Sequence, residues 1–243
     1  MKNWIFSLLI ITSLKAHAQV AEPDKKLFSE SLGETEWQAL NELLTSFDLF
    51  LEENYPNQSL EDQTRLFLKA FDDDSPTKWS FTNPNIYRAF QQAESSGLRK
   101  EMYFIGDDGA SYITSDTVHV NRLPYFEDDF EDIIDIPSFE PLSEEEQLKI
   151  LEEEQAFEEM RKMSLTTNRF GSFLSSFLLI KGSDPLIDEY IMTKNEVGDL
   201  SPYLVAFGML KMKKQSSVSW GMRLIIVYEL YYPILHWHFY IQR

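Results

Sequence analysis

The stretch TEWQALNELLTSFDLFLEEN, residues 35–54, decides the fold class because it is typical of one long amphipathic helix. Its apolar residues recur at alternating steps of three and four, and Glu and Asp fill the other faces. The apolar positions are Trp37, Leu40, Leu44, Phe47 and Leu51. A helix with such a stripe buries it against other elements. The stretch therefore predicts a helical protein built around a shared core.

Helix start signals continue after this stretch. Ser59 to Asp62 resembles a capping box and opens a second helix, which the DDDSP run at 72–76 stops. Asn83, followed by a proline, starts a third helix that ends near Gly97. Further helical patterns run from Ser143 to about Met163, from Asn168 to Lys181, from Asp184 to about Glu196 and from Ser201 to about Lys214.

The C-terminal run WGMRLIIVYELYYPILHWHFYIQR, residues 220–243, is apolar enough to be buried on most sides. Its internal Arg, Glu and Pro argue against a membrane helix. Up to Tyr232 the pattern predicts a helix. Beyond Pro233 a kinked helix and a strand both fit the pattern, and the helix is favoured.

Residues 101–120, EMYFIGDDGASYITSDTVHV, have the composition of a β-hairpin around a turn at Gly106 to Gly109. An isolated hairpin is marginally stable in water. We therefore expect it to lie on the helices or to pair with a strand that the sequence does not reveal. The predicted fold class is mostly α, in an α+β arrangement: an exported helical protein with a small β-hairpin inserted mid-chain.

The segment YFEDDFEDIIDIPSFEP, residues 125–141, mixes carboxylates with apolar residues and contains no lysine or arginine. Its apolar residues follow no sustained period and its prolines forbid a long helix, so the segment is extended. The favoured interpretation is a connector packed on its own protein. The alternative is a docking segment for a partner protein with a basic or grooved surface. In that alternative the contacting residues are Phe126, Phe130, Ile133, Ile134 and Phe139.

The first residues have the features of a secretory signal peptide: Lys2, an apolar run from Trp4 to Leu14, and an Ala-x-Ala site that ends at Ala18. We therefore expect an exported protein, periplasmic or extracellular, with no transmembrane segment after cleavage. The predicted division of the chain is a signal peptide at 1–18, an N-terminal helical lobe at 19–123, an acidic extended connector at 124–141 and a C-terminal helical lobe at 142–243.

Composition excludes several classes of chemistry. Cysteine is absent, which rules out disulfides, thiol catalysis and thiolate metal sites. The formal net charge is −18, from 40 acidic residues against 22 Lys and Arg, so we expect no nucleic-acid partner. No His-Glu-x-x-His, Walker or dinucleotide motif occurs in the sequence.

Three features invite a chemical interpretation. His236 and His238 would converge on one side of a strand, as in Zn or Cu sites, but would diverge on a helix, and aromatic packing is the favoured interpretation. Asp72 to Pro76 and Gly106 to Gly109 resemble calcium ligands without EF-hand spacing, so a helix stop and a turn are favoured. Glu229 lies in an apolar run, which predicts a buried carboxylate with a basic or hydroxyl partner, or a tuned acid.

These observations favour an exported soluble protein that acts as a non-enzymatic protein-interaction or structural module and has no cofactor. One alternative is a metal-dependent hydrolase that uses His236 and His238. A second alternative is a calcium-stabilised binding module. Either alternative brings in a divalent metal, whereas the interaction module needs only a partner protein.

Overall fold

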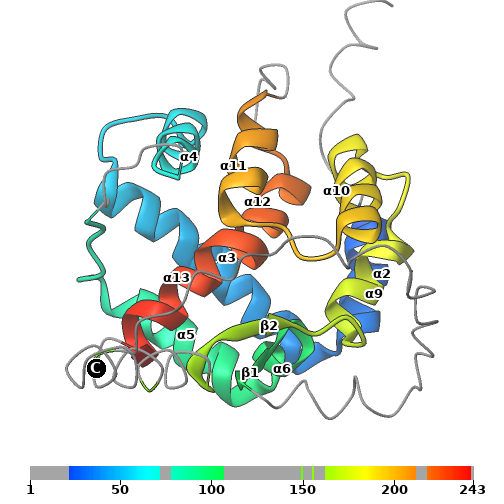
Figure 1. The fold of residues 1–243 in the computed structure, drawn as a ribbon. Coiled ribbons are helices and arrows are strands. Elements are labelled where there is room, and N and C mark those ends of the chain that lie inside the picture. Colours follow the sequence, from blue (N-terminus) through cyan, green and yellow to red (C-terminus); the bar gives the residue numbers. More distant parts are fainter. Residues whose placement is uncertain are drawn as a thin grey trace, which may run out of the picture. The chain divides into compact units, whose positions relative to one another are not determined.

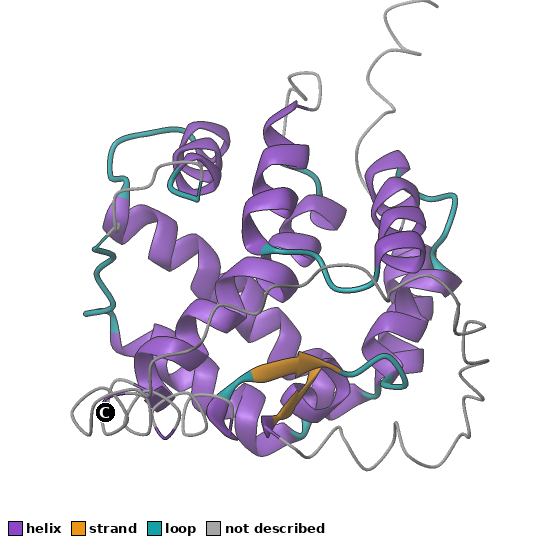
Figure 2. Cartoon of the chain, in the orientation of Figure 1, coloured by secondary structure: helices purple, strands orange, loops and turns teal. Residues whose placement is uncertain are grey.

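The computed structural model describes residues 22–71, 78–106, 149, 155, 162–211 and 218–241. Over these residues the chain is mostly helical and contains a two-stranded antiparallel sheet (Figure 2), which confirms the predicted class. The predicted signal peptide and the acidic segment, with Phe126, Phe130, Ile133, Ile134 and Phe139, lie outside the described residues. So do the predicted boundaries near 124 and 141.

The chain divides into two compact units, one made of residues 1–103 with 167–243 and the other of residues 104–166. The core and the sites described below belong to the first unit. Its α-helices, labelled in Figure 1, are α2 (Glu22–Leu32), α3 (Glu34–Asn54), α4 (Leu60–Lys69), α5 (Pro84–Ser96), α6 (Leu98–Met102), α9 (Ser172–Leu179), α10 (Pro185–Val197), α11 (Pro202–Lys211), α12 (Trp220–Ile226) and α13 (Tyr232–His236). Two π-helices, η2 (Val227–Tyr231) and η3 (Trp237–Ile241), precede and follow α13.

The helix starts predicted at Ser59, Asn83 and Asp184 are confirmed by their capping bonds, whereas the helix predicted from Asn168 begins at Ser172 and the start predicted at Ser143 lies outside the described residues. Ser59 accepts a hydrogen bond from the Asp62 amide at the start of α4, and Asn83 accepts one from the Asn85 amide before α5. Asp184 does the same for the Leu186 amide before α10. Each of these bonds satisfies an amide that has no partner inside the helix, which fixes where the helix begins.

An aromatic cluster joins α3 to the C-terminal helices. Phe47 and Phe50 of α3 lie 5.1 and 5.2 Å from Tyr231 of η2 and 5.3 and 5.6 Å from Phe67 of α4, measured between ring centroids. All four side chains are fully buried. Burial of each contributes on the order of 1.5–3 kcal/mol to folding. The stripe predicted for residues 35–54 is therefore covered by α4, the next helix in sequence, and by the C-terminal helical run.

Residues 220–241 form one helical run, so the helix predicted beyond Pro233 is confirmed and the strand alternative is wrong. In the π turn that precedes Pro233, the amide donor for the Tyr228 carbonyl would be that of residue 233, which proline lacks. The Tyr103 hydroxyl donates to this carbonyl instead. A tertiary contact thus satisfies the carbonyl that the proline leaves without its helical donor.

The sheet differs from the predicted hairpin. Strand β1 (Tyr103–Ile105) falls inside the predicted segment, but its described partner is β2 (Leu165–Thr167), a strand that the sequence did not reveal. The Gly106 amide donates to the Ser164 carbonyl at 2.8 Å, just past the end of β1. Residues 107–120, which would form the second hairpin strand, lie outside the described residues.

Within the described part of the chain, no helix has both the length and the apolar character needed to cross a membrane.

Candidate functional site

An aromatic groove of about 680 Å³ lies between elements from both ends of the first unit's sequence. Its wall residues come from the segment after α4, from the start of α11 and from the run η2 to η3. The lining residues are Phe71, Lys78, Trp79, Phe81, Pro202, Leu230, Pro233, Ile234, Trp237 and His238. Ligand-binding pockets are usually concave, mostly apolar and about 300–1,000 Å³ in volume, and this groove falls within that range.

The segment that carries Trp79 and Phe81 is held to the C-terminal turn of α3. The Glu53 carboxylate accepts hydrogen bonds from the Thr82 amide at 2.7 Å, from the Asn83 amide at 3.1 Å and from the Ser80 hydroxyl. Burial acts to raise the pKa of the Glu53 carboxyl, but these hydrogen bonds lower it to about 2. The groove wall is therefore anchored through a carboxylate that stays ionised.

Trp79 has its own anchor, because its indole Nε1 donates to the Tyr55 hydroxyl at 3.1 Å. Its ring packs on Phe67 at 5.7 Å between centroids. Among the other lining residues Trp237 is 47% exposed, whereas Leu230 is 1% exposed. The lining of the groove thus combines one buried apolar residue, several half-buried aromatic and apolar side chains, and a large aromatic side chain that is exposed to solvent.

Exposed apolar residues continue from the groove onto α11, whose first residue, Pro202, lines it. Tyr203, Leu204 and Phe207 are 46%, 51% and 39% exposed. Tyr203 and Phe207 stack with centroids 5.8 Å apart, as side chains four residues apart on a helix do. The exposed apolar surface therefore extends beyond the groove itself.

The two histidines do not form the converging pair that a strand would give. They lie on the helical run, where His236 is buried and stacks on Tyr240, while His238 stacks on Phe81 with centroids 4.3 Å apart. Over the described ranges, no three His, Asp or Glu side chains gather as a metal ion would require. The DDDSP residues Asp72 to Pro76, and residues 107–109 of the predicted turn, lie outside those ranges.

A buried ion pair connects α10 to η2. The Lys194 amine donates to Glu229 Oε1 at 2.7 Å, and the two side chains are 8% and 6% exposed. The Tyr190 hydroxyl donates to the same carboxylate oxygen. Burial, and then the charge of Glu229, raise the pKa of Tyr190 well above its usual value. The prediction of a buried Glu229 with a basic or hydroxyl partner is confirmed, and it has both.

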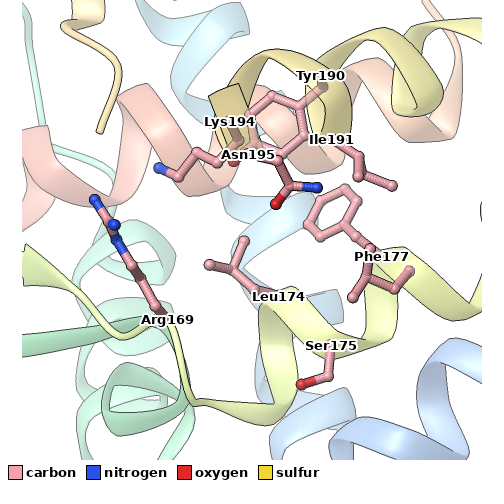
Figure 3. A pocket seen from close by; sticks show the side chains of 9 residues that line it. Arg169, Leu174, Ser175, Phe177, Tyr190, Ile191, Lys194 and Asn195 are labelled. Atoms are coloured by element: carbon pink, nitrogen blue, oxygen red, sulfur yellow. The ribbon is translucent and has the colours of Figure 1, made fainter. Parts of the chain in front are cut away.

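A second pocket, of about 200 Å³, lies beside this ion pair between α9 and α10. Figure 3 shows the cationic groups of Arg169 and Lys194 on one side of it and the side chains of Phe177 and Ile191 on the other. The remaining lining residues are Leu174, Ser175, Leu178, Tyr190 and Asn195. The pocket therefore has a charged end and an apolar end.

The chain has no significant match among protein-family models, curated proteins or solved structures. Function is therefore inferred from the geometry of the groove and of the pocket.

Sequence reasoning did not find the groove. Trp79, Phe81 and Trp237 are ordinary aromatic residues in a chain that is 14% aromatic, and no local spacing links them. The same holds for Arg169 and Lys194, which are brought together by the turn before α9 and by α10. Only for Glu229 did the sequence carry a signal, a lone acid inside an apolar run.

Proposed function

We propose that this chain is an exported, non-enzymatic interaction module whose aromatic groove docks an extended, apolar segment of a partner protein. The observation that carries the proposal is the exposed Trp237 in a groove lined mostly by apolar and aromatic side chains. Tryptophan in a desolvated pocket is the side chain that most often dominates binding energy at protein interfaces. No chemical step is needed for this role.

The exposed face of α11 favours a protein segment over a small molecule as the occupant. Tyr203 and Leu204 lie directly after Pro202 of the groove, and both are about half exposed. Contiguous exposed apolar surface marks interaction sites on soluble proteins. A peptide that fills the groove and continues along α11 covers this surface, whereas a ligand confined to the groove leaves it in water.

The experiment is selection of random linear peptides against residues 19–243, followed by binding measurements with the enriched peptide. The proposal predicts a consensus with aromatic or proline anchors, and a change in tryptophan fluorescence when the peptide binds. Trp237→Ala should weaken binding by about tenfold or more, because truncation of an anchor side chain costs about 2 kcal/mol.

The matched control is Phe170→Ala, which removes an exposed aromatic ring that does not line the groove. This variant should bind within about twofold of the unaltered chain. If the selection yields no consensus, or if both variants bind equally well, the groove is not a docking site.

Export has a separate test. With the first eighteen residues intact, the chain expressed in a secreting host should appear outside the cytoplasm with Gln19 as its first residue. Retention of the uncleaved chain inside the cell would remove export from the proposal and leave the groove argument unchanged.

A further inference from the structure

We propose that the pocket between α9 and α10 binds a small carboxylate whose apolar end is about the size of a phenyl ring or a branched alkyl group. This site is separate from the aromatic groove and does not depend on it. The juxtaposition that carries the proposal is a pair of cations, Arg169 and Lys194, at one end of a pocket whose other end is apolar (Figure 3).

A carboxylate of the chain itself now lies between these two cations, and it is loosely held. Asp199 is 3.8 Å from Arg169 and 3.6 Å from Lys194, both beyond hydrogen-bond distance. Its side chain is 51% exposed. The pair with Arg169 is exposed on both sides, and such pairs contribute little to stability. Lys194 is buried, but its close partner is Glu229 at 2.7 Å rather than Asp199 at 3.6 Å. Asp199 can therefore turn into solvent and give up its place to a ligand carboxylate at little cost.

The charges around the pocket suit a monoanion. Lys194 is held in place by Glu229, which neutralises one positive charge. Once Asp199 turns away, the charge of Arg169 has no counter-ion at the pocket. The site then carries one excess positive charge, which a single ligand carboxylate balances. Arginine is also the side chain best suited to a carboxylate, since its two parallel N–H groups match the two oxygens.

The apolar end sets the size of the ligand. Phe177, Ile191 and Leu174 line it, and the pocket has a volume of about 200 Å³. An apolar protein cavity of about 150 Å³ is known to be large enough for benzene. The pocket therefore has room for an aromatic ring or a short branched chain together with the carboxylate that reaches the cations.

Polar groups on the pocket wall complete the site. The Asn195 amide extends into the space between the charged and apolar ends (Figure 3). The Ser175 hydroxyl, in contrast, donates to the Gly171 carbonyl at 3.0 Å and is occupied by its own helix. Asn195 is therefore the neutral group that can add a hydrogen bond to the bound carboxylate.

The experiment measures the binding of benzoate to residues 19–243 by calorimetry, with benzyl alcohol as the uncharged analogue and acetate as the anion without an apolar end. Benzoate should bind at least about tenfold more tightly than either, because each analogue lacks one of the two contacts. Equal binding of benzoate and benzyl alcohol would overturn the role of the cations, and absence of benzoate binding would overturn the site.

Two variants should change the affinity for benzoate in opposite directions. Arg169→Gln should weaken benzoate binding by about tenfold, because a charge-assisted contact is lost. Asp199→Asn should tighten it several-fold, because the competing carboxylate is removed. Both changed residues are more than half exposed, so folding should survive. Arg65→Gln, an exposed position on α4, is the control and should bind as the unaltered chain does. If both test variants shift affinity in the same direction, or neither does, the proposal fails.

Discussion

Replacement of Lys194 by methionine should destabilise the protein strongly, because it leaves the Glu229 carboxylate buried without its cation. The two side chains are 8% and 6% exposed, with 2.7 Å between Nζ and Oε1. At that distance and an effective dielectric constant of about 20, their attraction is on the order of 6 kcal/mol before desolvation is counted. Loss of one partner from a buried pair typically costs about 3–5 kcal/mol.

The assay is urea unfolding of Lys194→Met, Glu229→Gln and the double variant, with melting temperatures as a second measure. At about 2–4 °C per kcal/mol for a chain of this size, Lys194→Met should lower Tm by roughly 6–20 °C. The double variant should cost less than the sum of the single variants by about 2 kcal/mol or more, because the amide that replaces the Glu229 carboxylate is neutral and keeps the Tyr190 hydrogen bond.

The control is Lys26→Met, which breaks the pair with Glu30, where the atoms are 3.6 Å apart and the side chains are 74% and 61% exposed. Its cost should stay below about 0.5 kcal/mol. If Lys194→Met costs less than about 1 kcal/mol, or if the two single effects add, the pair is not the desolvated contact described above.

Three further predictions concern Glu53, Gly171 and the effect of divalent metals. Glu53→Gln should cost about 1 kcal/mol near neutral pH. Because the folded-state pKa of Glu53 is lowered from 4.5 to about 2, this difference should be complete above pH 4.5 and should shrink as the pH falls toward 2. Gly171→Ala should cost about 1–3 kcal/mol, since the new Cβ would lie 2.1 Å from the Glu101 carbonyl oxygen; Gly208→Ala meets nothing within 4 Å and should be neutral or stabilising. Calcium and zinc should leave Tm at the value of a sodium control of matched ionic strength, and a shift with zinc alone would restore the histidine-based hydrolase.

Local patterns predicted most of the helices because their start and stop signals lie within a few residues of each other. Ser59, Asn83 and Asp184 each cap the helix that follows, and the spacing from residue 35 to 54 marks the buried face of α3. Such signals depend on hydrogen bonds and periodicity inside one segment. The helices that these signals predict can therefore be identified without knowledge of the tertiary fold.

The sites could not be predicted because their residues are distant in sequence. The Glu229 carboxylate contacts Lys194 and Tyr190, which lie thirty-five and thirty-nine positions earlier in the sequence. Strand β2 has only three residues and pairs with a strand far earlier in the chain, so its sequence carries no usable alternation. In the groove, Trp79 and Trp237 line the same space although they belong to segments that are far apart in the sequence.

The distance in sequence between the two ends of the first unit also has a consequence for synthesis. Tyr232 donates to Glu94, 138 residues earlier, and Tyr231 bonds Ser46, 185 residues earlier. At about 5–20 residues per second, the ribosome adds Tyr232 on the order of 7–28 s after Glu94. Until then the aromatic face of α3 has no C-terminal cover. The apolar face of α3 therefore stays open to non-native contacts and to chaperone binding until Tyr231 and Tyr232 have been synthesised and can cover it.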